Sequence, residues 1–279
     1  MQDIEIIVPK PDIPTNVQKY VPQYGEDKVI KKHIDAGIPL CAIGPKGTGK
    51  TLSFASVAQE EKVPLIQFDC SESTKRGDLI GRFVLIGSEV KFQLGALPTA
   101  LATAQSEGAC ILVLEELTAL PPQQQKMLNQ ILDWRKHVYI PEIGKTFHSN
   151  GGKLLVAATT NPSTYAAVFE LNEDLKSRLS ILRYNYPKES VEMEIIKASV
   201  SPVIEEEAKN LITLARESRE AVKEGRVDYA LSPRDVCLTL QARNAYNNLK
   251  GAIKTTILNK YESQAEIDFM SQRIHSIFP

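Results

Sequence analysis

Residues 44–51 decide the fold, and they read Gly44-Pro45-Lys46-Gly47-Thr48-Gly49-Lys50-Thr51. The stretch matches GxxxxGK[ST] in full, and a random chain of this length matches on the order of once in a hundred tries. Glycines allow backbone N–H groups to wrap around phosphates, and the N-terminus of a following helix adds positive potential. In this pattern Lys50 reaches the β- and γ-phosphates, and the Thr51 hydroxyl ligates Mg²⁺. We therefore predict that residues 44–51 bind a nucleoside triphosphate.

Residues 26–36 are expected to form a helix, and five short apolar runs follow it with helical material between them. The runs are Ile38–Ile43, Pro64–Asp69, Cys110–Glu115, Leu154–Thr159 and Ser180–Tyr186. They are continuous rather than alternating, which is typical of parallel strands that are buried on both faces. We therefore predict an α/β fold, a parallel sheet covered by helices on both faces.

The sequence outside these runs suggests three parts. Residues 1–25 are expected to form an extended N-terminal arm, because they contain Pro9, Pro11, Pro14 and Pro22. Residues 26–187 are expected to form the nucleotide-binding α/β domain, with Pro187 at its end. Residues 188–279 become helical in pattern and are expected to form a small all-helical lid domain, whose helix-start signals are Ser232-Pro233-Arg234-Asp235 and Ser263-Gln264-Ala265-Glu266.

Two acidic residues end one of the apolar runs. Glu115 and Glu116 follow Ile111-Leu112-Val113-Leu114. Ligands of α/β sheets gather at the carboxyl ends of the strands, so both carboxylates are expected near the phosphate loop. We predict that Glu115 holds Mg²⁺ and that Glu116 orients the attacking water. Two solvated acids at the end of a strand are the alternative.

Composition narrows the class of protein. Lys and Arg number 33 and Asp and Glu 34, for a net charge of −1, whereas domains held on nucleic acid usually carry a basic excess. No apolar run approaches the roughly 20 residues that cross a bilayer. The acidic N-terminus lacks the order of a signal peptide. The four cysteines are scattered, which favours buried reduced thiols and a cytoplasmic location. The four histidines show no ligand spacing.

Three further motifs carry a resemblance to a known family. They are Ala158-Thr159-Thr160-Asn161-Pro162, Glu173-Asp174-Leu175-Lys176-Ser177-Arg178-Leu179 and Leu231-Ser232-Pro233-Arg234-Asp235. With the phosphate loop and the acid pair, they resemble AAA+ ATPases, and within them the MoxR-like group that includes the CbbQ and NorQ activators. The resemblance runs through nearly the whole chain and implies the strand order 5-1-4-3-2.

The resemblance also implies roles for these motifs. Asn161 looks like the sensor 1 residue that helps to place the lytic water. Arg178 looks like an arginine finger that reaches the γ-phosphate of the neighbouring subunit. Arg234 looks like the sensor 2 residue of the lid. The family implies a homo-oligomeric, hexameric ring that uses ATP and Mg²⁺, acts like a chaperone on a client enzyme, inserts a metal in some cases, and works with a von Willebrand factor A domain adaptor.

Two β-hairpins separate this group from other AAA+ proteins. The first follows Gly77-Asp78-Leu79-Ile80-Gly81-Arg82, with arms Phe83–Ile86 and Val90–Leu94 around a Gly87-Ser88 turn. The second runs from Val138-Tyr139-Ile140-Pro141 to Lys145-Thr146-Phe147. In the family both hairpins face the central channel. The apolar residues of these hairpins could contact a client protein, or they could pack on their own domain, and the sequence favours neither alternative.

Other features leave alternatives open. Glu115 stands where the family usually has Asp, so an ATP-gated scaffold with little hydrolysis is a second hypothesis. Arg135-Lys136 motivates a third, a nucleic-acid motor, although the near-neutral charge argues against it. Trp134 follows the helical run Met127, Leu128, Ile131 and Leu132 and is expected to pack. No motif excludes GTP.

Overall fold

The computed structural model describes residues 4–161 and 170–278, which form two compact units. The first unit consists of Met1–Val17, Tyr24–Gly44 and Lys50–Tyr184. The second consists of Gln18–Gln23, Pro45–Gly49 and Asn185–Pro279. The three-part division into residues 1–25, 26–187 and 188–279 stays a prediction.

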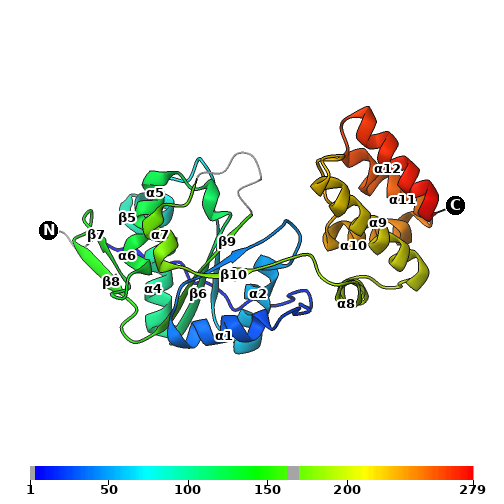
Figure 1. The fold of residues 1–279 in the computed structure, drawn as a ribbon. Helices are drawn as coiled ribbons and strands as arrows, with labels where there is room; N and C mark the ends of the chain where they lie inside the picture. Colours follow the sequence, from blue (N-terminus) through cyan, green and yellow to red (C-terminus); the bar gives the residue numbers. More distant parts are fainter. Residues whose placement is uncertain (1–3, 162–169, 279) are drawn as a thin grey trace. The chain divides into compact units, whose positions relative to one another are not determined.

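A five-stranded parallel sheet forms the centre of the first unit (Figure 1). Its spatial order is β10-β2-β9-β6-β3. In chain order the strands are β2 (Leu40–Ile43), β3 (Leu65–Asp69), β6 (Ala109–Glu115), β9 (Lys153–Thr160) and β10 (Ser180–Arg183). When the strands are numbered one to five in chain order, their spatial order in the sheet reads 5-1-4-3-2, so the predicted order is confirmed.

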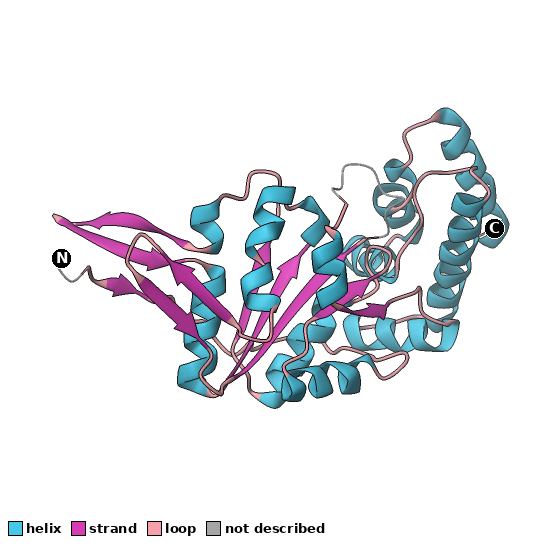
Figure 2. Cartoon of the chain, turned by 60° about the vertical axis from the view of Figure 1, so that its left-hand side comes forward, coloured by secondary structure: helices cyan, strands magenta, loops and turns pink. Residues whose placement is uncertain are grey.

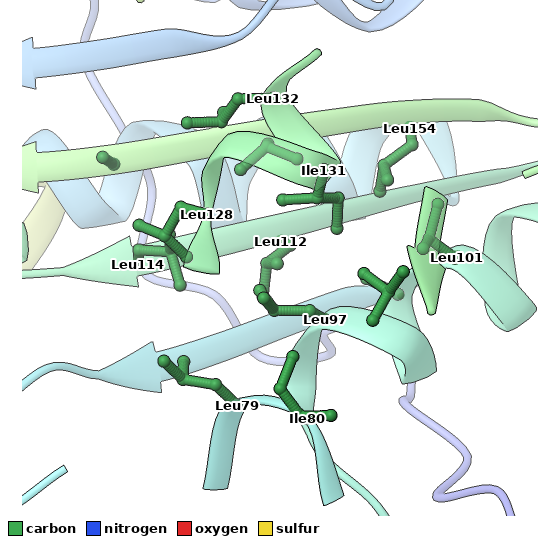
Figure 3. Packing of buried hydrophobic residues seen from close by; sticks show 14 of the residues in the cluster. Leu79, Ile80, Leu97, Leu101, Leu112, Leu114, Leu128, Ile131, Leu132 and Leu154 are labelled. Carbon is green, nitrogen blue, oxygen red and sulfur yellow. The ribbon is translucent and has the colours of Figure 1, made fainter. Parts of the chain in front are cut away.

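Helices cover both faces of this sheet because alternate side chains of its strands enter two different cores. Cys110, Leu112 and Leu114 of β6 belong to one core, and Ile111 and Val113 belong to the other. The first core includes residues of α4 (Ala96–Glu107) and α6 (Asn129–Leu132) (Figure 3). Met127 of short α5 (Pro122–Met127) packs against it. The second includes residues of α1 (Glu26–Ala36) and α2 (Lys50–Glu61). The predicted α/β fold with helices on both faces is confirmed.

Both predicted hairpins are present (Figure 2). The first joins β4 (Gly81–Ile86) and β5 (Glu89–Leu94) between α3 (Arg76–Leu79) and α4. The second joins β7 (His137–Ile140) and β8 (Lys145–His148). The sequence did not predict β1 (Ile6–Ile7), a strand of the N-terminal arm that pairs in parallel with β5 and makes the first hairpin part of a three-stranded sheet.

Trp134 corrects one expectation from the sequence. The expected helix is broken into α5 and α6, and Asp133 leaves the helical conformation with φ −70° and ψ 158°. Residue 134 therefore does not continue the buried face that Leu128 and Ile131 form. The Trp134 side chain is 88% exposed, so the expectation that it packs was wrong.

The second unit is helical and contains α8 (Glu189–Ser199), α9 (Glu205–Lys223), α10 (Pro233–Tyr246), α11 (Leu249–Thr256) and α12 (Gln264–Ile277). The two predicted helix starts are capping boxes, at Ser232 for α10 and at Ser263 for α12. Because each box satisfies backbone N–H groups that a helix start leaves unpaired, it fixes where the helix begins.

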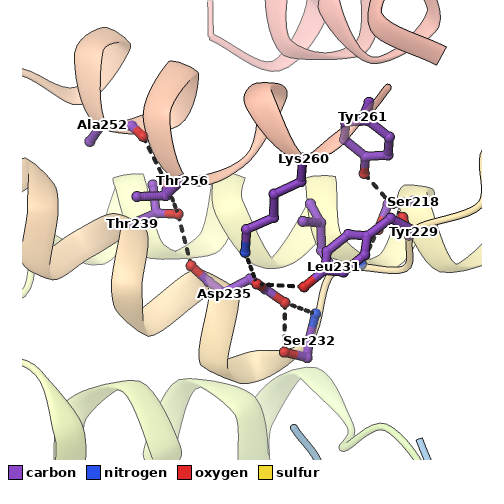
Figure 4. A network of polar contacts seen from close by, with 10 residues as sticks. All are labelled: Ser218, Tyr229, Leu231, Ser232, Asp235, Thr239, Ala252, Thr256, Lys260 and Tyr261. Atoms are coloured by element: carbon purple, nitrogen blue, oxygen red, sulfur yellow. Dashed lines mark hydrogen bonds and ion pairs between the residues drawn. The ribbon is translucent and has the colours of Figure 1, made fainter. Parts of the chain in front are cut away.

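Asp235 is the centre of a polar network in this unit (Figure 4). Its Oδ2 accepts hydrogen bonds from the backbone N–H and the hydroxyl of Ser232, at 2.7 and 2.6 Å. Its Oδ1 accepts one from Tyr229 at 3.0 Å and pairs with the Lys260 ammonium. Burial acts to raise the pKa of Asp235, but the hydrogen bonds from Lys260 and Ser232 outweigh it and lower that pKa. The network therefore requires the ionised carboxylate.

The cysteine side chains are all buried free thiols, as predicted. Burial raises the pKa of the Cys41 and Cys110 thiols to about 12, so neither forms a thiolate at neutral pH. Throughout residues 4–161 and 170–278, no helix has the length and apolar character needed to cross a membrane.

Candidate functional site

The loop that follows β2 can adopt its path only because it contains glycines. Gly47 and Gly49 have φ angles of +72° and +86°, a region that other residues rarely adopt. A Cβ atom on Gly44 would lie 2.3 Å from the carbonyl oxygen of Tyr184. The Thr48 hydroxyl donates to the carbonyl of Pro45 at 2.9 Å, inside the loop. Local backbone geometry thus accounts for the glycine pattern that the sequence shows.

Lys50 is the first residue of α2, and its side chain is only 9% exposed. Its Nζ donates to the carbonyl of Gly44 at 2.7 Å and to Oδ1 of Asn161 at 3.2 Å. Asn161 directly follows β9, the strand beside β2. The structure therefore brings two predicted site residues, one from the phosphate loop and one from the sensor 1 motif, into direct contact.

Thr51 and Glu115 form the second contact of the site. The Thr51 hydroxyl donates to Oε2 of Glu115 at 2.8 Å. A hydroxyl and a carboxylate are oxygen ligands of the kind that Mg²⁺ takes, usually with phosphate oxygens and waters completing the coordination. Within the described parts of the chain, no group of three His, Cys, Asp or Glu residues is placed to hold a metal ion. The residues present fit a magnesium ion that arrives with a phosphate ligand.

Negative charge is concentrated where β3 and β6 end. Asp69 and Glu115 are register partners at the ends of these strands, and Glu116 comes next. Burial raises the pKa of the nearby Cys70 thiol to about 12, and the charges of these three carboxylates add to the rise. Such a concentration of charge favours a divalent cation at this edge of the sheet.

Glu116 has an unusual backbone conformation. Its φ and ψ are 50° and 48°, in the left-handed region, which costs a residue other than glycine about 1–3 kcal/mol. Its backbone N–H donates to the Thr159 hydroxyl of β9 at 3.2 Å. The strain at Glu116 motivates a functional hypothesis for this residue, because strained backbone collects at functional sites.

The two predicted arginines belong to different units of the chain. Arg178 ends α7 (Glu173–Arg178), and its guanidinium donates to the carbonyl of Asp174 at 2.9 Å. Arg234 lies in the second unit, exposed in the first turn of α10.

Sequence reasoning missed two pairs of residues that the fold brings together. Gln67 of β3 donates through Nε2 to Oε1 of Glu115 at 3.0 Å. His137 and His148 are register partners in the second hairpin, with stacked rings 5.8 Å apart. The predicted turn between β7 and β8 could have revealed the histidine pair, whereas Gln67 carried no motif.

Known proteins resemble this chain along most of its length. Residues 39–179, about half of the chain, match the family described as AAA domain (dynein-related subfamily). Protein NorQ of Paracoccus denitrificans is 27% identical over 248 residues, 89% of each protein. An uncharacterized protein of Staphylococcus aureus (strain bovine RF122 / ET3-1) is 24% identical over 224 residues, 80% of this chain and 84% of the relative. A crystal structure of a candidate ATPase from Cytophaga hutchinsonii shares the fold with a TM-score of 0.50 at 18% identity, covering 91% of this chain and 88% of that one.

The parallel sheet, the glycine-dependent loop and the Thr51–Glu115 contact define a P-loop nucleotide-binding protein. The chain belongs to the AAA domain family (dynein-related subfamily) and is a MoxR-like AAA+ ATPase, as the sequence predicted. The roles of individual site residues stay predictions.

Proposed function

We propose that this chain hydrolyses MgATP as one subunit of a homo-oligomeric, hexameric ring and uses the resulting motion to activate a client protein. The observation that carries the proposal is the paired arrangement of Lys50 with Asn161 and of Thr51 with Glu115 at the carboxyl ends of neighbouring strands. These contacts support the proposal because phosphoryl transfer requires a cationic donor to the phosphates and oxygen ligands for a metal ion.

The phosphate loop and two side chains are proposed to hold the nucleotide. Backbone N–H groups of residues 44–51 would bind the phosphates, and Lys50 would exchange its contact with the Gly44 carbonyl for phosphate oxygens. Thr51 would ligate Mg²⁺ directly and Glu115 would hold it, directly or through water. When bound, Mg²⁺ would neutralise charge on the phosphate oxygens.

Glu116 and Asn161 are proposed to act on the attacking water. The Glu116 carboxylate would accept a hydrogen bond from that water and orient it toward the γ-phosphate, with the Asn161 amide fixing its position. Arg178 from the neighbouring subunit and Arg234 from the same chain would stabilise charge that develops on the γ-phosphate.

The hairpins are proposed to contact the client. Leu85 and Val90 are register partners near the tip of the first hairpin and are 71% and 60% exposed. Phe83, two register pairs closer to the base, packs edge-on against its register partner Phe92 with ring centroids 5.1 Å apart. Phe92 is 1% exposed and belongs to the core of the first unit, so the base of the hairpin packs on its own domain, while the tip presents apolar surface. By family resemblance the client process is activation of, or metal insertion into, a target enzyme, with a von Willebrand factor A domain adaptor.

Glu116→Gln tests the proposed role of Glu116. The variant should bind MgATP with near wild-type affinity, and its rate of phosphate release should fall at least about a hundredfold. Glu107→Gln, at an exposed site at the end of α4, serves as the matched control and should leave both quantities unchanged. Hydrolysis at the wild-type rate by Glu116→Gln would refute the role proposed for this carboxylate.

A mixing experiment tests the finger supplied in trans. Arg178→Ala alone should lose about 10³–10⁵ in turnover. Rings that mix Arg178→Ala subunits with Lys50→Ala subunits should regain activity. In such a ring the intact phosphate loop of an Arg178→Ala subunit can meet the intact Arg178 of a Lys50→Ala neighbour. A confirmed mixed ring without recovery would count against action between subunits.

The ATP-gated scaffold is the second candidate function, favoured by the longer Glu115 in place of Asp. A phosphate-release assay in the presence of Mg²⁺ distinguishes it, since the scaffold would bind ATP with almost no release. The structure gives little support to a nucleic-acid motor: Arg135 is paired with Asp133 at 3.0 Å, and the Lys136 ammonium donates to the carbonyls of Gly37 and Leu154 at 2.6 and 3.2 Å.

A further inference from the structure

The Glu115 carboxylate is held at both of its oxygens. Oε2 accepts from the Thr51 hydroxyl at 2.8 Å, and Oε1 accepts from the Gln67 amide at 3.0 Å. Thr51 belongs to the phosphate loop motif, whereas no motif includes Gln67. The second contact thus fixes the rotation and the reach of a side chain that is proposed to face Mg²⁺.

Strand register explains why Gln67 reaches Glu115. Gln67 pairs with Val113 across β3 and β6, and Asp69 pairs with Glu115. Gln67 and Glu115 are therefore diagonal neighbours on the same face of the sheet, a separation that only long side chains bridge. A carboxylate one methylene shorter, as the family usually has at this position, would fall short of the amide.

Charge explains why an amide suits this position. Asp69 and Glu116 flank Glu115, and both are acidic. A carboxylate at position 67 would add repulsion, whereas an amide N–H donates to Glu115 without adding charge. The neutral donor therefore orders the acid and leaves its negative charge available to a cation.

We propose that Gln67 is a positioning residue that holds the Glu115 carboxylate in place for Mg²⁺ and so compensates for the presence of Glu where the family usually has Asp. The inference rests on the proposed function, because it assigns Gln67 to the metal side of the same nucleotide site. Gln67 acts through Glu115 and not on the nucleotide.

The position of Gln67 separates this role from a structural one. Gln67 lies on β3, the edge strand of the sheet, where its side chain is exposed. An exposed hydrogen bond contributes little to folding stability, and its removal should leave the fold intact.

Gln67→Met removes the amide and keeps the length of the side chain. The probe is the fluorescent analogue mant-ADP, titrated into the protein over a series of Mg²⁺ concentrations and also with EDTA. We expect the Mg²⁺ concentration for half-maximal binding to rise about three- to tenfold, as loss of one solvent-exposed hydrogen bond predicts, with affinity in EDTA unchanged. Gln105→Met, at an exposed site on α4, is the matched control and should show no shift.

A double-mutant cycle with Glu115→Asp assigns the effect to this contact. In the Glu115→Asp background the shorter carboxylate no longer reaches residue 67, so Gln67→Met should change the Mg²⁺ dependence by less than about twofold. Equal shifts in both backgrounds would overturn the proposal, as would a wild-type Mg²⁺ dependence for Gln67→Met. A loss of affinity that is equally large in EDTA would also overturn it, because it would indicate a general structural effect.

Failure of this proposal can be told from failure of the proposed function. If the wild-type protein binds mant-ADP with Mg²⁺ and Gln67→Met behaves identically, only the role of Gln67 falls. If the wild-type protein binds no nucleotide at all, both fall.

Discussion

Replacing Arg219 by methionine should destabilise the second unit by about 3–5 kcal/mol, because it would leave a buried carboxylate without its partner. Arg219 of α9 is 7% exposed, and Glu192 of α8 is fully buried. The guanidinium donates to both oxygens of Glu192 and, through Nε, to the carbonyl of Leu231 at 2.8 Å. It also lies over the Tyr186 ring, 4.2 Å from the centroid.

The magnitude follows from what each substitution leaves behind. Arg219→Met leaves the Glu192 charge in an apolar setting, where the penalty is several kcal/mol. The double variant Arg219→Met/Glu192→Leu removes both charges, so it should recover most of the loss. Arg216→Met is the matched control on the same helix: Arg216 pairs with Glu189 at 2.8 Å, but both side chains are exposed, and the cost should stay below about 1 kcal/mol.

Equilibrium urea unfolding followed by far-UV circular dichroism measures these free energies. The two units can unfold in separate transitions, so the curve is fitted to two steps and the step shifted by Arg219→Met is assigned to the second unit. The reasoning is refuted if Arg219→Met costs no more than Arg216→Met, or if the double variant is no more stable than Arg219→Met alone.

Three further predictions concern other parts of the chain. Hydrogen bonds from Lys260 and Ser232 hold the pKa of Asp235 below its usual value. The ionised Asp235 therefore contributes stability that is complete above about pH 3.9 and is lost as the pH falls through the lower pKa of the folded state. Asp235→Asn should lower the melting temperature at neutral pH, and its difference from the wild-type melting temperature should shrink in strong acid. Iodoacetamide should alkylate Cys110 at least about tenfold more slowly in the native protein than in urea, because burial raises its thiol pKa to about 12, and mass spectrometry of the labelled peptides measures both rates. Gly44→Ala should destabilise the first unit by about 1–3 kcal/mol in urea unfolding, since its Cβ would meet the Tyr184 carbonyl; an unchanged midpoint would contradict the close approach.

Much of the fold could be predicted because its signals are local. The continuous apolar runs marked the parallel strands, and the helix predicted at residues 26–36 is α1 (Glu26–Ala36) with the same limits. The Gly87-Ser88 turn located the first hairpin, since Gly87 has a positive φ of +63°. Lys50, Thr51 and Glu115 were singled out from the sequence because their motifs follow the carboxyl ends of β2 and β6, two strands that are separated in the sheet by β9.

The features that were missed depend on contacts between distant residues. Ile6–Ile7 forms a strand only because β5 offers an edge, and the arm sequence alone shows prolines. The contact of Gln67 with Glu115 depends on the register of β3 against β6, which no local pattern reveals. Trp134 was placed in the core because helical periodicity was extended one residue past the point where Asp133 ends it.

Titration of the purified protein with MgATP, by isothermal calorimetry, tests the central claim that residues 44–51 bind a nucleoside triphosphate. The account predicts saturable binding at one site per chain in the wild-type protein, and a loss of at least about tenfold in affinity in Lys50→Ala, which removes a charge-assisted contact to phosphate. Lys126→Ala, at an exposed lysine of α5, should bind as the wild type does. Absence of binding by the wild-type protein, or equal affinity in Lys50→Ala, would contradict the account.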